Sequence, residues 1–180
     1  MGDKQPQSSP ALERIADAVE GKSQIREHEQ IRHFQMRIAR DGTWFYLGTP
    51  INRIALVKLF STVLNRGDDG RYWLITPVEQ GLIDVDDVPF MAVELTHVDG
   101  LDCGGTDDLF RFRTNLDEEI DCGPDHPLRV AINPETGEPS PYILVRDRLE
   151  ARLTRSVFYE LADLAREREV DGKRVYGVWS

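Results

Sequence analysis

The chain has 180 residues and a mass of 20.6 kDa, which suits one domain or two small ones. Hydrophobic residues make up 40% and charged residues 30%, so the chain can build a core. The formal net charge of −10, from 22 basic and 32 acidic residues, excludes a general polyanion binder. The mixture of both signs excludes a disordered acidic tail, and no motif names a reaction.

The lack of targeting signals predicts a cytoplasmic protein. Residues 1–10 are polar and do not resemble a secretory signal. The longest apolar runs have about four residues, far fewer than the roughly 20 that cross a bilayer. The two cysteines, Cys103 and Cys122, allow a structural disulfide, but two free thiols are the favoured interpretation.

Arginine dominates the basic residues. Only Lys4, Lys22, Lys58 and Lys173 are lysine, which leaves 18 arginines. Guanidinium groups bind phosphate and carboxylate through two parallel hydrogen bonds, so the bias can indicate anion recognition. A GC-rich genome produces the same bias without functional meaning, so the positions of the arginines must carry the argument.

The first half of the chain is predicted to hold a leader and a small α+β domain. Residues 1–22 form a polar leader and a short helix, and residues 23–86 form the domain. Alternation of apolar and polar residues predicts strands at Phe34–Ile38 and Thr43–Leu47, joined by a tight turn. The apolar segment Ile51–Leu64 predicts a helix that is buried between two layers, because apolar residues cover most of its circumference.

The second half, residues 87–180, is predicted to form a second α+β domain that repeats the element order of the first. Leu128–Ala131 resembles Met36–Ala39 at an offset of 92 positions. A helix is predicted over Leu149–Arg166 and closes this domain. The agreement between the two halves in element order, turn chemistry and local residues favours a duplication, although any α+β chain can be divided in this way. The predicted fold class is therefore α+β, with two related domains of mainly antiparallel sheet plus helix.

Several short segments, taken in order, resemble one bacterial family. They are Asp41–Trp44, Leu47–Arg53, Thr76–Glu79, Val88–Phe90, His126–Arg129 and Pro141-Tyr142. The chain from about Ser23 onward is similar to the domain-of-unknown-function family twelve-eighty-five. The resemblance implies a duplicated α+β core whose C-terminal half is superficially similar to pleckstrin-homology folds. It also implies a site between the halves for a nucleotide-like ligand and a place in signal transduction, but no established activity.

The signatures of common enzyme and metal sites are missing. The sequence has no GxxxxGK[ST], GxGxxG, GxSxG or HExxH motif. Its four histidines are scattered, and no His/Cys/carboxylate set has zinc spacing. The acidic stretch Asp84–Asp87 lacks the glycine and glutamate of a calcium loop and is predicted to be a solvated turn. We predict no metal, no cofactor and no catalytic residue.

Two groups of arginines are candidates for binding an anion. Arg111 and Arg113 share one face of a predicted strand with Asn115, and Arg152 and Arg155 lie with Arg148 on one line of the predicted C-terminal helix. An ordinary solvated sheet face or a salt-bridged helix surface accounts for these patterns as well. The full set of candidate binding residues is Arg53, Arg111, Arg113, Asn115, His126, Arg129, Arg152 and Arg155.

Arg53 and His126 complete this set. Arg53 stands in the first turn of the predicted helix, where a cation opposes the helix dipole. It is expected to meet a carboxylate, Glu79 or Glu94, or an anionic ligand at the helix N-terminus. His126 precedes a strand and is predicted to contact a ligand or to be structural rather than catalytic.

The favoured function is a non-enzymatic ligand-binding or regulatory protein that senses a nucleotide-like or phosphorylated small molecule in signal transduction. Its site is predicted in the cleft where the two domains meet. One alternative is a protein-interaction adaptor that uses the exposed edge of the second sheet or its helix. Another is an enzyme acting on an anionic metabolite, with His126 and a carboxylate as acid and base. Long nucleic acids and membranes are not expected partners, while a homodimer stays open.

Overall fold

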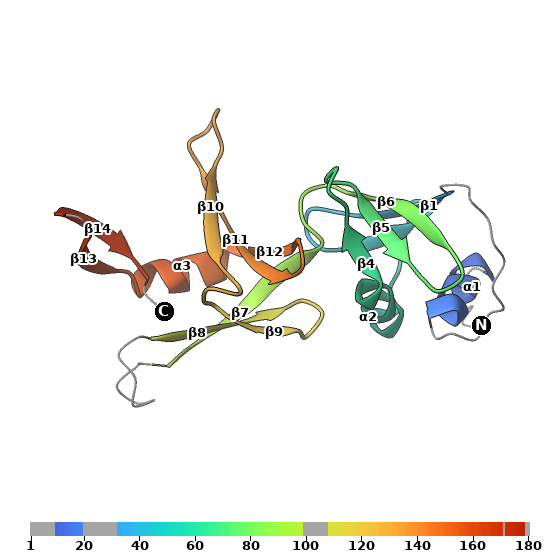
Figure 1. Ribbon diagram of the computed structural model, residues 1–180, viewed down its shortest axis with the longest axis horizontal. Helices are drawn as coiled ribbons and strands as arrows, with labels where there is room; N and C mark the ends of the chain where they lie inside the picture. The colour runs from blue at the N-terminus through green and yellow to red at the C-terminus, as the bar shows by residue number, and fades with distance from the viewer. Residues whose placement is uncertain (1–9, 20–31, 99–107, 171, 179–180) are drawn as a thin grey trace, which may run out of the picture. The chain divides into compact units, whose positions relative to one another are not determined.

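The computed structural model describes residues 10–19, 32–98, 108–170 and 172–178 (Figure 1). Among them are two six-stranded sheets and three short helices, so the fold is α+β. None of the helices in these ranges is long and apolar enough to cross a membrane. The leader and Cys103 lie outside the described residues.

The chain divides into two compact units, called unit 1 and unit 2 below. Unit 1 holds residues 1–38 and 43–85, and unit 2 holds residues 39–42 and 86–180. Each unit contains one of the two six-stranded sheets. Each therefore has its own core, and the two are described separately.

Unit 1 contains, among the described residues, two helices and six strands. They are α1 (Pro10–Val19), β1 (Arg32–Ile38), β2 (Trp44–Tyr46), β3 (Thr49–Pro50), α2 (Ile54–Thr62), β4 (Leu64–Arg66), β5 (Tyr72–Ile75) and β6 (Gln80–Val85). The strand order is β3-β2-β1-β6-β5-β4, and the central pair β1 and β6 is parallel. The predicted alternation of β1 is confirmed, because Phe34, Met36 and Ile38 are buried.

Helix α2 is shorter and less buried than the sequence predicts. The prediction covered Ile51–Leu64, but Ile51–Arg53 belong to neither helix nor strand, the helix begins at Ile54, and Leu64 begins β4. The prediction of burial on all sides is wrong, because Ile54 is 55% exposed and the helix packs through one face. That face consists of Leu56, Val57, Phe60 and Ser61.

Unit 2 contains the second sheet, one helix and a separate two-stranded ribbon among the described residues. They are β7 (Phe90–Val98), β8 (Leu109–Thr114), β9 (Glu119–Asp121), β10 (Leu128–Ile132), β11 (Pro139–Arg146), β12 (Leu149–Leu153), α3 (Arg155–Asp163), β13 (Arg166–Val170) and β14 (Lys173–Gly177). The sheet has the order β10-β11-β12-β7-β8-β9 and curls into half of a barrel. Figure 1 shows the hairpin of β10 and β11 extending beyond this sheet.

The C-terminal helix begins six residues later than the sequence predicts. Residues Leu149–Leu153 form β12, which pairs with β11 and with β7, and α3 starts only at Arg155. Arg148, Arg152 and Arg155 therefore do not lie on one helical line. Arg148 lies in the turn before β12, Arg152 on the strand and Arg155 at the first position of the helix.

The two sheets have the same topology. When strands are counted from the first strand of each unit, both sheets have the order 3-2-1-6-5-4, and in both the first and sixth strands are the parallel pair. This finding equates β1 with β7 and β4 with β10. The predicted offset of 92 positions instead equates β1 with β10, and it is wrong because β1 is a central strand and β10 is an edge strand.

Candidate functional site

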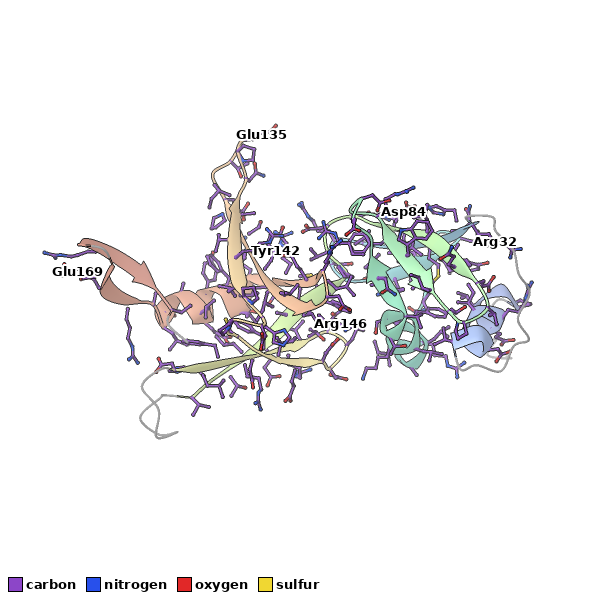
Figure 2. All side chains as sticks on the ribbon, in the orientation of Figure 1. Arg32, Asp84, Glu135, Tyr142, Arg146 and Glu169 are labelled. Atoms are coloured by element: carbon purple, nitrogen blue, oxygen red, sulfur yellow. The ribbon has the colours of Figure 1, made fainter. Side chains whose placement is uncertain are left out.

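Three side chains of unit 2 form a row across neighbouring strands. The sheet register pairs Arg129 of β10 with Tyr142 of β11, and Tyr142 with Arg152 of β12. Directly paired residues point to the same face of a sheet. The guanidinium of Arg129 lies over the Tyr142 ring, 4.2 Å from the ring centroid. We call these three residues the arginine–tyrosine row; Figure 2 labels Tyr142 on its strand.

Asp87 places a carboxylate against this row. Tyr142 donates its hydroxyl hydrogen bond to the two carboxylate oxygens at 3.1 and 3.3 Å. Nη1 of Arg152 donates to Asp87 at 3.4 Å, and Nε of Arg40 lies 3.7 Å from the same oxygen. The Asp87 side chain is only 16% exposed. A hydroxyl and two guanidinium groups thus surround one carboxylate, which is how proteins hold an anion.

Glu150 is the second carboxylate of the site. It precedes Arg152 by two residues on β12 and so shares its face. Glu150 accepts two hydrogen bonds from Arg129, at 2.5 Å from Nε and 2.8 Å from Nη2, and its side chain is 13% exposed. The hydrogen bond to Glu150 raises the pKa of Arg129. Arg40 and Arg152 thus lie against Asp87, and Arg129 lies against Glu150.

Tyr142 acts as a neutral donor in this arrangement. Burial of the ring raises the pKa of Tyr142, and the negative charge of Asp87 raises it further. The hydroxyl therefore keeps its proton at neutral pH and donates a hydrogen bond to an anionic acceptor. An anion at the position of the Asp87 carboxylate would meet this hydroxyl together with the two guanidinium groups.

The structure places Arg111 and Arg113 on the outer face of β8, as the alternation predicts. Phe110 and Phe112 are buried on the other face. Arg111 donates to the two oxygens of Asp121 at 2.5 and 2.9 Å, and this bond raises the pKa of Arg111 and lowers that of Asp121. Both arginines of β8 already have carboxylate partners.

Arg113 and Asn115 have different surroundings. Arg113 binds Glu94 through Nε and Nη2 and donates to Asp117 at 3.0 Å, and the hydrogen bond to Glu94 raises its pKa. Asn115 accepts the backbone N–H of Met91 through its side-chain oxygen at 3.0 Å. Asn115 therefore joins the end of β8 to β7 and does not share an anion site with the two arginines.

His126 fixes a turn against β11. Its Nδ1 lies 3.0 Å from the carbonyl oxygen of Leu144, which can only accept, so Nδ1 carries the proton. The backbone of His126 also exchanges hydrogen bonds with Gly123 at 3.1 and 3.3 Å. These contacts hold His126 in the turn, and whether it also contacts a ligand stays a prediction. Arg155 donates to the hydroxyl of Tyr159 at 3.2 Å, which raises the pKa of Arg155.

Arg53 belongs to unit 1 and is the N-cap of α2 rather than a first-turn residue. Its carbonyl oxygen accepts the N–H groups of Leu56 and Val57 at 2.9 and 3.2 Å. The carboxylates expected to meet it are engaged elsewhere: Glu79 lies 3.4 Å from Arg32, and Glu94 binds Arg113. The prediction of a site where the two domains meet stays a prediction.

Sequence reasoning missed Asp87, Tyr142, Glu150 and Arg40. The interpretation of Asp84–Asp87 as a solvated turn is wrong at both ends: Asp84 and Val85 belong to β6, and tertiary contacts with Tyr142 and Arg152 bury the carboxylate of Asp87. A usable signal existed for Tyr142, because the predicted turn at residues 133–138 joins its strand to that of Arg129 as a hairpin, and the hairpin register pairs the two residues. Within the described residues, no group of three or more His, Cys, Asp or Glu side chains is placed to hold a metal ion.

Comparison with known proteins identifies relatives over nearly the whole chain. The family model for the domain of unknown function DUF1285, N-terminal domain, matches residues 27–88, and the model for the DUF1285 C-terminal domain matches residues 89–180. Curated proteins give no match.

Two solved structures are similar to the chain. A DUF1285 family protein from Silicibacter pomeroyi DSS-3 is 41% identical, with a TM-score of 0.78, over 96% of this chain and 92% of that one. A DUF1285 family protein from Shewanella baltica OS155 is 25% identical, with a TM-score of 0.54, over 71% of this chain and 90% of that one. The ordered motifs, the two family models and these structures agree: the chain belongs to the DUF1285 family.

Proposed function

We propose that unit 2 binds a small anionic ligand, nucleotide-like or phosphorylated, at the arginine–tyrosine row, and that the protein is a non-enzymatic sensor in signal transduction. One observation carries the proposal. The carboxylate of Asp87 is held by the Tyr142 hydroxyl and by Arg152 and Arg40, so the donors of an anion site are already assembled around an internal anion.

A phosphate group would compete with Asp87 for these donors. Its oxygens accept hydrogen bonds as carboxylate oxygens do, and it carries more negative charge. Asp87 therefore acts as an internal competitor that a ligand displaces. The three guanidinium groups favour a small anion, while the net charge of −10 on the whole chain disfavours a long nucleic acid.

A base or other planar group could be accommodated next to the phosphate. The guanidinium of Arg129 lies over the Tyr142 ring, 4.2 Å from the ring centroid, so the pair offers a cationic and aromatic surface. The family resemblance implies a nucleotide-like ligand and a C-terminal half superficially similar to pleckstrin-homology folds, and both expectations agree with this assignment. The curled sheet of unit 2, followed by α3, suits that likeness.

Arg152→Ala and Asp87→Asn are expected to change ligand affinity in opposite directions. Loss of a charge-assisted donor costs about 1.5–3 kcal/mol, so Arg152→Ala weakens binding roughly ten- to hundred-fold. Asp87→Asn removes the competing charge and strengthens binding, although it destabilises the unliganded protein by leaving guanidinium groups without their carboxylate. Titration calorimetry with nucleoside triphosphates, cyclic nucleotides and inorganic phosphate measures both effects, after thermal-shift screening of the same panel.

Arg113→Ala is the matched control, because this arginine of the same sheet binds Glu94 and Asp117 and has no place in the row. It should leave the dissociation constant unchanged. The proposal is overturned if no member of the panel binds, or if Asp87→Asn weakens binding as Arg152→Ala does. The second result would mean that Asp87 orders the site and does not compete for it.

A further inference from the structure

The described residues give the two six-stranded sheets four edge strands, and these edges differ sharply. Edge strand β3 has two residues, one of them proline. Strand β4 has three residues and ends in Arg66. Strand β9 also has three residues, of which Glu119 and Asp121 are acidic. Short strands, proline and charge are the ordinary protections of a sheet edge against pairing with another chain. Strand β10 has five residues in regular register, and its apolar face carries neither proline nor a charged side chain.

The backbone of β10 offers a regular set of groups for pairing. Leu144 donates its N–H to the carbonyl of Pro127 at 3.1 Å, and Asn133 donates to Glu138 at 2.9 Å. Backbone groups alternate in direction along a strand, so Arg129 and Ala131 face β11. The N–H and C=O groups of Leu128, Val130 and Ile132 consequently point away from it, and no other strand of the described residues lies on that side.

The side chains of β10 are suited to contact. Val130 is 51% exposed and Ile132 is 60% exposed, although both are large and apolar. The one charged residue of the strand, Arg129, points to the opposite face, where Glu150 holds it. Figure 2 labels Glu135 at the tip of the β10–β11 hairpin, which stands clear of the rest of the unit 2 sheet. A second strand can therefore approach β10 along its full length.

We propose that β10 is an interface with a second copy of this chain, joined by antiparallel pairing of β10 with β10 of the other copy. The strand is complementary to itself when the symmetry axis passes at Val130. Leu128 then faces Ile132 of the second copy, and Val130 faces Val130, so one face of the ladder is apolar throughout. On the other face each Arg129 lies opposite Ala131, so like charges are not opposed there.

The size of the interface sets the strength of this dimer. One pair of five-residue strands buries less than the roughly 1,200–2,000 Å² of a stable complex. The dimer is therefore expected to be weak and to depend on concentration. This proposal concerns the edge of the sheet and is independent of ligand binding at the arginine–tyrosine row.

Hydrogen exchange of the full-length chain, measured by NMR from roughly 10 μM to 1 mM, tests the pairing directly. The outward amides of Leu128, Val130 and Ile132 should slow by about tenfold or more as concentration rises, while those of Arg129 and Ala131, which already bond to β11, should not change. Sedimentation over the same range should show monomer converting to dimer.

Val130→Lys should abolish the dimer, because the two lysine ammonium groups would face each other at the symmetry axis. Its thermal unfolding should stay close to wild type, since Val130 is half exposed. Ile75→Lys, at another exposed strand position, should leave the dimer intact. A folded Val130→Lys variant that still dimerises overturns the proposal. The proposal is also overturned if the chain stays monomeric at all concentrations and its outward amides exchange fast. The partner of β10 would then be a strand from a different protein.

Discussion

Phe60→Ala is expected to lower the free energy of unfolding of unit 1 by about 3–5 kcal/mol. Phe60 is fully buried in α2, and its ring lies against Trp44 with centroids 6.4 Å apart. The loss combines the transfer free energy of the ring with the cavity that it leaves. Unit 1 has about 80 residues and hence a total stability of roughly 4–12 kcal/mol, so the variant loses a large part of it.

Tryptophan fluorescence measures this effect, because two of the three tryptophans, Trp44 and Trp73, belong to unit 1. In a guanidinium titration the variant should start with red-shifted emission or lose its native signal at a much lower denaturant concentration. Ile54→Ala is the matched control on the same helix, since Ile54 is 55% exposed, and it should change stability by less than about 0.5 kcal/mol. A loss below about 1.5 kcal/mol for Phe60→Ala would show that the core around α2 closes the cavity.

Gly81→Ala is expected to cost about 1–3 kcal/mol through overpacking. Gly81 lies on β6 beside β1, and a Cβ at this position would lie 2.6 Å from Cε2 of Phe34 and 2.9 Å from the carbonyl oxygen of Arg32. The ring can turn aside, but the carbonyl belongs to the paired backbone of β1 and cannot yield without disturbing the ladder. Equilibrium denaturation of the wild type and the variant gives the difference.

A double-mutant cycle separates the two contacts. Phe34→Leu shortens the side chain above Gly81, so the combination of Phe34→Leu with Gly81→Ala should cost less than the sum of the two single changes. Strict additivity would assign the whole penalty to the Arg32 carbonyl. Gly123→Ala should be almost neutral, because no atom lies within 4 Å of the added Cβ and the glycine needs no left-handed conformation.

The strands that have one buried face could be predicted from the sequence. In β1 and β8 the apolar side chains alternate with polar ones, and the structure buries the apolar set in both. The failure at Leu149–Leu153 has a definite cause. Leu149, Leu153, Val157 and Leu161 recur every four residues, and a spacing of four fits one face of a helix and one face of a strand. These residues form a strand because they pair with β7 and β11, and no local sequence pattern contains the information about that pairing.

The candidate site could be predicted only in part. Arg129 and Arg152 were among the expected binding residues, and the structure brings both to one row. For Arg152 the expected reason was a line on a helix, whereas the actual reason is the register of strand β12. Asp87 and Tyr142 are 55 positions apart in the chain, so their hydrogen bond depends on the folded sheet. Burial of a carboxylate by distant partners leaves no trace in the composition of its own segment.

The central parallel pair determines when each unit can fold during synthesis. In unit 1 the first strand must pair with the last, as at Arg37 and Asp84, and in unit 2 β7 waits in the same way for β12. A growing chain therefore holds its first strand unpaired on one side until almost the entire unit has left the ribosome. Closure over so many residues makes folding slow. A chain that terminates before β12 would present β7, with its buried Phe90 and Ala92, as an unprotected edge prone to aggregation.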